Sequence, residues 1–177
     1  HLLMYRKSRS KKVVEEIVGD NSQYFRGVII SDFYAAYNTY LGFHQRCWVH
    51  LNRDIDELKF KYPKHPPLNI WAKRVRDIYL EAKAYTGPPP DTPSGTAAQQ
   101  RINKQCYFEE KLQQVANPYL TSDAPMSTLC GRILTYLPEL FVFVRLPNVS
   151  SSNNNAERII RHTVVARKIS GGTRSEK

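Results

Sequence analysis

The order of apolar and polar positions predicts alternating strands and helices over the first third of the chain. Three short apolar or β-branched runs are typical of strands: residues 2–6 (LLMYR), 27–32 (GVIISD) and 42–50 (GFHQRCWVH). Each is followed by a segment of helical character: residues 8–19, with an apolar stripe ended by Gly19, the turn at 33–41, and the charged stretch 51–62 before Pro63. This alternation indicates an α/β fold.

From residue 66 onward the apolar positions recur at helical spacing only. Helices are predicted over 68–85, 99–117 and 126–146, the last with a break at Pro138. Residues 87–96 (GPPPDTPSGT) form a Pro/Gly linker that we expect to be mobile. The pattern therefore divides the chain into a first core part at 1–65, an all-helical insertion at 66–146, and a final helix within 147–177 that completes the core.

The final helix begins in a polar run, SSNNN at 151–155, where Asn153 or Asn154 is the predicted N-cap. Five residues share one side of the helix and are expected to face the core: Ala156, Ile159, Ile160, Thr163 and Ala166. Glu157, Arg161 and Lys168 fall on the opposite side. An acid in the first turn suits the helix dipole. Glu157 is then either half of a surface pair with Arg161 or a functional acid, and spacing leaves both open.

The chain carries 26 Lys and Arg against 16 Asp and Glu, a formal charge of +10 over 177 residues. This excess predicts a polyanionic partner, with nucleic acid ahead of an anionic membrane surface. No stretch is long and apolar enough to predict a membrane span. Three widely spaced cysteines do not form a disulfide framework, which favours a reducing cytoplasm.

Two places could hold chemistry on local sequence alone. Asp32 ends a strand, where α/β sheets bind ligands, but it could equally cap the following turn. Cys47 and His50 have C-x-x-H spacing, which is half of a zinc site, and a buried structural cysteine is the favoured interpretation. For Tyr34, Tyr37 and Tyr40 a core stripe is favoured over a stacking surface.

Three motifs in order, GVIISDFYAAYN, QRCWVHLNRD and NNNAERIIRHTVVARK, resemble those of DDE transposases of the insertion-sequence-66 family. The first resembles that family's strand-borne aspartate, and the second its C-W-x-H segment, here Cys47, Trp48 and His50. The third resembles its Asn-Asn-x-Ala-Glu-Arg block. Ser152 departs from the pattern, because the family often has Asp there.

The resemblance implies an α/β, ribonuclease-H-like core with a helical insertion before the last catalytic helix. Asp32 then matches the second acid of the triad and Glu157 the third. The strand at 2–6 carries no acid, so we expect the first catalytic aspartate upstream of His1, and we expect the chain alone to be inactive.

The implied activity is metal-dependent DNA cleavage and strand transfer, with two Mg²⁺ or Mn²⁺ ions in the complete site. Arg158, Arg161, Arg167 and Lys168 are the expected contacts to DNA phosphates. The expected partners are double-stranded transposon ends and target DNA, bound by a homo-oligomer in the cytoplasm and associated with the nucleoid. The alternatives are a structure-selective nuclease of the same fold and a non-catalytic DNA-binding module.

Overall fold

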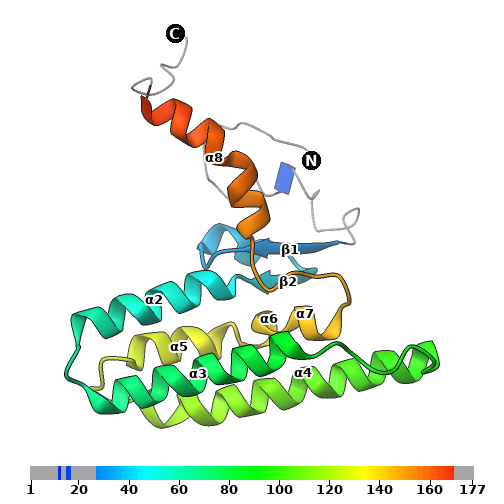
Figure 1. Ribbon diagram of the computed structural model, residues 1–177, viewed down its shortest axis with the longest axis horizontal. Helices are drawn as coiled ribbons and strands as arrows, with labels where there is room; N and C mark the ends of the chain where they lie inside the picture. The colour runs from blue at the N-terminus through cyan, green and yellow to red at the C-terminus, as the bar shows by residue number, and fades with distance from the viewer. Residues whose placement is uncertain (1–11, 13–14, 17–26, 170–177) are drawn as a thin grey trace.

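A computed structural model describes residues 12, 15–16 and 27–169 (Figure 1). The predicted strand at 2–6 lies outside the described residues, as does most of the predicted helix at 8–19. The elements, in order, are β1 (Val28–Ser31), the 3-10 helix η2 (Ala35–Thr39), β2 (Phe43–Arg46), α2 (Trp48–Lys61), α3 (Pro66–Ala84), α4 (Ser94–Ala116), the 3-10 helix η3 (Asn117–Tyr119), α5 (Ser127–Thr135), α6 (Leu137–Leu140), α7 (Val142–Arg145) and α8 (Asn154–Ile169).

The two described strands form a parallel sheet in which Val28 pairs with Phe43 and Ser31 with Arg46. The mixed helices and parallel strands are compatible with the predicted α/β class. Of β1 only Ser31 is buried, whereas the three apolar residues before it are half-buried. A run of β-branched residues such as 27–32 is typical of a strand buried on both faces, and within the described part of the chain β1 does not reach that burial.

The predicted strand at 42–50 is half strand and half helix. β2 ends at Arg46, Cys47 occupies the N-cap position, and α2 starts at Trp48. The physical reason is burial at helical spacing, since Trp48, Leu51 and Ile55 turn one side of α2 into the core. His50 consequently lies in the first turn of a helix rather than in a strand.

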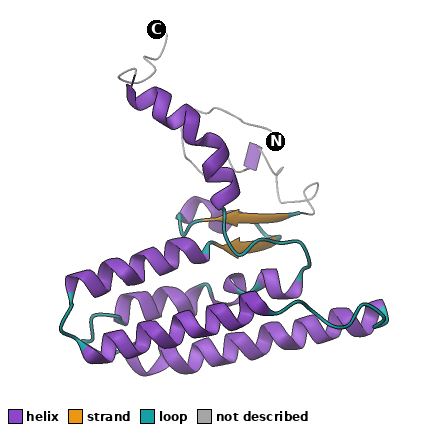
Figure 2. Cartoon of the chain, in the orientation of Figure 1, coloured by secondary structure: helices purple, strands orange, loops and turns teal. Residues whose placement is uncertain are grey.

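Helices α2 to α7 lie below the sheet, and α8 projects away on the other side of it (Figures 1 and 2). Trp48 joins α2 to the helices that follow. Its indole stacks on Tyr79 of α3 at 4.6 Å between ring centroids, and its Nε1–H donates to the Leu140 carbonyl at 2.6 Å. The buried apolar residues of α2, α3, α4 and α5 form one continuous cluster. The helical segment after residue 66 therefore shares its core with α2.

Two predicted boundaries differ from the structure. Helix α4 starts at Ser94, within the predicted linker, because the Pro-rich part of that linker ends at Pro93. The last helical region is interrupted at Tyr136 and again at Phe141, rather than at Pro138. Pro138 lies in the first turn of α6, where a missing backbone N–H costs no hydrogen bond.

The start of α8 matches the prediction in position but not in its capping contact. The Asn153 carbonyl accepts from the Glu157 N–H at 3.1 Å, yet Asn153 Oδ1 is buried and has no hydrogen-bond partner in the described part of the chain. Ala156, predicted to face the core, is exposed, and Ile159 is half-buried. The side chains of Ile160, Thr163 and Ala166 lie outside the described residues.

Candidate active site around Asp32 and Glu157

Asp32 directly follows β1, at the carboxyl end of the parallel strand pair. Its Oδ1 accepts a hydrogen bond from the Tyr34 N–H at 3.0 Å, which forms a tight turn before η2. The side chain also lines a pocket of about 380 Å³. Both interpretations left open for Asp32 are therefore compatible with its position, since one carboxylate oxygen fixes the turn and the side chain faces a pocket.

The main chain at Asp32 is held by a buried cation that the sequence did not single out. Arg46 is fully buried, and its Nη1 donates to the Asp32 carbonyl at 2.9 Å. Its Nε donates to Glu139 Oε2 at 2.6 Å, and its guanidinium lies over the Tyr136 ring at 4.3 Å from the centroid. Because Glu139 lies in α6, the end of β1 is fixed in part by a helix from the predicted insertion.

A second buried polar group, His44, completes this network. Its Nε2 lies 2.7 Å from Ser31 Oγ, and its Nδ1 lies 3.2 Å from Glu139 Oε2. Burial, together with the charge of Arg46, lowers the pKa of His44 to about 3, so the ring is neutral near pH 7. The Ser31 hydroxyl, which has a single proton, also donates to the Asp32 carbonyl at 2.7 Å.

This serine–histidine–glutamate geometry is structural and not that of a hydrolase. Ser31 is only 4% exposed, so its hydroxyl cannot meet a substrate. The network instead satisfies the polar side chains of β2 beneath Asp32. The pattern of apolar and polar residues could not predict this network, because Glu139 and Arg46 are 93 residues apart in the chain.

Glu157, in the first turn of α8, meets His50 of α2. His50 Nε2 lies 3.3 Å from Glu157 Oε1, and His50 also lines the pocket that contains Asp32. The Glu157 side chain is 40% exposed and that of His50 is 20% exposed. The contact that the structure gives for the Glu157 carboxylate is thus with His50, and not with Arg161 as the surface-pair interpretation expected.

The family model described as Transposase IS66 family matches residues 1–177, the whole chain. The chain belongs to the IS66 transposase family. No curated protein and no solved structure matches it. Membership supports a transposase role, and with it DNA as the partner and a nuclease or transferase activity in the full protein. None of the described helices is both long and apolar enough to cross a bilayer.

The basic residues expected to contact DNA are only partly described in this IS66 family chain. Arg158 and Arg161 are both exposed on α8. The side chains of Arg167 and Lys168 lie outside the described residues. The exposed pair is therefore accessible to a polyanion.

The C-x-x-H spacing of Cys47 and His50, which is half of a zinc site, has no completing ligands within the described residues. Cys47 is fully buried, which agrees with the interpretation as a core cysteine, and His50 faces Glu157. Over residues 12, 15–16 and 27–169 no group of three or more His, Cys, Asp or Glu could hold a metal ion. Tyr40 is buried as predicted, but Tyr34 is 48% exposed and lines the Asp32 pocket.

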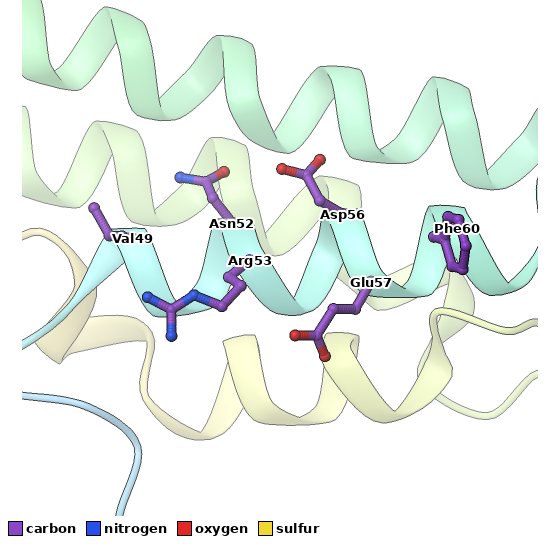
Figure 3. A pocket seen from close by; sticks show the side chains of 6 residues that line it. All are labelled: Val49, Asn52, Arg53, Asp56, Glu57 and Phe60. Carbon is purple, nitrogen blue, oxygen red and sulfur yellow. The ribbon is translucent and has the colours of Figure 1, made fainter. Parts of the chain in front are cut away.

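A larger hollow of about 540 Å³ lies along the outer side of α2 (Figure 3). Its lining consists of Val49, Asn52, Arg53, Asp56, Glu57 and Phe60. All six come from one helix, and Phe60 is 89% exposed, so this is an open surface rather than an enclosed site. The Asp32 pocket is smaller but combines side chains from separate elements, which makes it the candidate active site.

Proposed function

We propose that this chain forms the catalytic part of a DDE transposase, with a ribonuclease-H-like core that cleaves DNA strands and joins them to a target. Asp32 serves as the second acid and Glu157 as the third. The observation that carries the proposal is His50, which lines the Asp32 pocket and lies 3.3 Å from Glu157. Two acids from distant parts of the sequence thus have a common neighbour beside one pocket.

The donor set fits a hard divalent cation such as Mg²⁺ or Mn²⁺. Asp32 and Glu157 offer carboxylate oxygens, and the hydrogen bond from Tyr34 occupies only Oδ1 of Asp32. When bound, two such ions would supply activation of the attacking water or 3′-hydroxyl and stabilisation of the leaving oxygen. Because a two-metal site needs a further acid and the described residues hold no such triad, we propose that the first acid lies outside them.

The chain's own residues then have separate tasks. Arg46 donates a hydrogen bond to the main-chain carbonyl of Asp32, and the His50 ring contacts the Glu157 carboxylate. Both contacts help to fix the two acids before substrate binds. Arg158 and Arg161, together with Arg167 and Lys168, bind phosphates of the DNA backbone largely without sequence preference. Residues 1–65 and 147–177 form the core, and 66–146 form the insertion.

The direct test substitutes each acid in the transposase polypeptide that carries this chain together with the first acid. We expect Asp32→Asn and Glu157→Gln each to reduce Mg²⁺-dependent cleavage of a transposon-end duplex by about a thousand-fold, since each removes a metal ligand. DNA affinity should remain within about two-fold. Asp77→Asn, an exposed acid on α3, is the control. Wild-type cleavage by either active-site variant would overturn the proposal.

If the first acid lies outside residues 1–177, these residues alone should not cleave DNA. The measurement is a nicking assay of the isolated chain with Mg²⁺ or Mn²⁺, and robust activity would contradict the placement of the first acid. A strand-transfer assay separates the transposase from a nuclease of the same fold, since only the transposase joins the cleaved 3′-end to a second duplex.

A further inference from the structure

The Asp32 pocket includes residues from the predicted insertion as well as from the core. Its core side contributes Asp32, Phe33 and Tyr34 after β1, and His50 and Asp54 of α2. Its other side contributes Arg132 of α5 and Tyr136, which follows α5. Arg132 is the one Lys or Arg among the described residues that line this pocket. A single cation from the insertion therefore lies in the pocket of a proposed catalytic acid.

The Arg132 side chain is already held in place. Its Nη1 pairs with Asp54 Oδ2, and its guanidinium carbon lies 5.4 Å from the centroid of the Phe33 ring. The Arg132 side chain is 33% exposed and that of Asp54 is 34% exposed. Two-thirds burial between a carboxylate and an aromatic ring restricts the rotamers of a long side chain, so less entropy is lost when it binds a ligand.

The pairing leaves most of the donor capacity of Arg132 available. A guanidinium has five N–H donors, and the hydrogen bond to Asp54 uses one, through Nη1. Its planar fork matches two oxygens of a phosphate group. The surrounding insertion is close to neutral, with nine Lys and Arg against seven Asp and Glu over residues 66–146. A generally basic surface therefore does not account for a cation at this position.

We infer that Arg132 binds a DNA phosphate beside the scissile bond, and that Asp54 positions the guanidinium when DNA is absent. This inference rests on the proposed function, because it takes the Asp32 pocket as the place of cleavage. It gives the insertion a direct part in substrate binding at the active site. Asp54 then acts as a positioning residue that competes with the phosphate for the same cation.

The test compares variants of the same full transposase polypeptide by fluorescence anisotropy with a labelled transposon-end duplex over a range of salt concentrations. Arg132→Ala should weaken binding about ten-fold and reduce the slope of log affinity against log salt by about one, because one phosphate contact is lost. Asp54→Asn should keep the slope and keep or raise the affinity. Lys73→Ala, which removes an exposed cation paired with Asp77, is the matched control and should change neither.

If Arg132 served only to join α2 to α5, Arg132→Ala and Asp54→Asn would lose similar thermal stability and leave the salt slope unchanged, which would overturn the inference. Should Arg132→Ala fail to fold, Arg132→Lys decides, because it keeps the charge and should keep the slope while losing affinity through the missing fork. Unchanged affinity of Arg132→Lys would also overturn the inference. Asp32→Asn separates the two proposals, since its loss of cleavage supports the proposed function whatever Arg132 does.

Discussion

Arg46 Nε lies 2.6 Å from Glu139 Oε2, and this contact joins the end of β2 to α6 across 93 residues of sequence. Arg46 is fully buried, whereas the Glu139 side chain is 33% exposed. The same guanidinium donates to the Asp32 carbonyl, so one buried cation connects a candidate catalytic residue to the helical segment. The contact therefore has consequences for both stability and activity.

Removing Glu139 should destabilise the fold strongly, because it leaves a buried charge without its carboxylate. We expect Glu139→Ala to lower the free energy of unfolding by about 3 kcal/mol, as measured by urea denaturation. Glu81→Ala is the control, since Glu81 forms an exposed pair with Lys111, and it should cost less than about 1 kcal/mol. Equal losses in the two variants would show that Arg46 does not depend on Glu139.

The free energy of unfolding should decrease as the pH falls through the range between the unfolded and folded pKa values of His44. The pKa of His44 is about 3 in the fold against an ordinary 6.5, so the unfolded chain binds the extra proton between these values. The His44 contribution is therefore fully present above about pH 6.5 and decreases as the pH falls toward 3. His44→Gln should have a flatter profile of unfolding free energy against pH over this range. Parallel profiles for the two proteins would contradict this assignment.

His50 should affect catalysis more than DNA binding, because its Nε2 lies 3.3 Å from the carboxylate of Glu157, the proposed third acid. We expect His50→Ala to reduce cleavage at least about ten-fold and to raise the Mg²⁺ concentration needed for half-maximal activity. DNA affinity should be unchanged. Arg53→Ala, on the exposed side of α2, is the control. An unaltered Mg²⁺ requirement in His50→Ala would leave His50 with a structural role only.

The cysteines should differ in reactivity according to burial. Cys106 is exposed, whereas Cys47 and Cys130 are buried, and burial raises the pKa of the Cys130 thiol to about 11. Alkylation of the native chain should therefore label Cys106 alone, as read by peptide mass spectrometry. Cys106→Ser should abolish native labelling. In denaturant, all three thiols of the unsubstituted chain should react. Rapid native labelling of Cys47 would contradict the packed start of α2.

The sequence by itself determined the features that depend on local order. β-branched residues predicted β1, apolar positions at helical spacing predicted α3 and α4, and the three motifs indicated the transposase family that the whole chain matches. It also selected Asp32 as a strand-end acid and Glu157 as a first-turn acid. These properties follow from neighbours within a few residues, which a linear pattern contains.

Only the tertiary structure decided which distant residues meet. Arg46 with Glu139, Glu157 with His50, and Arg132 with Asp54 are contacts across long stretches of chain, and no periodicity specifies such partners. The start of α2 at Trp48 likewise depends on burial of that indole against Tyr79 and Leu140. The physical reason is that local patterns determine which face of an element is apolar, whereas packing determines what that face, and each polar group beside it, will contact.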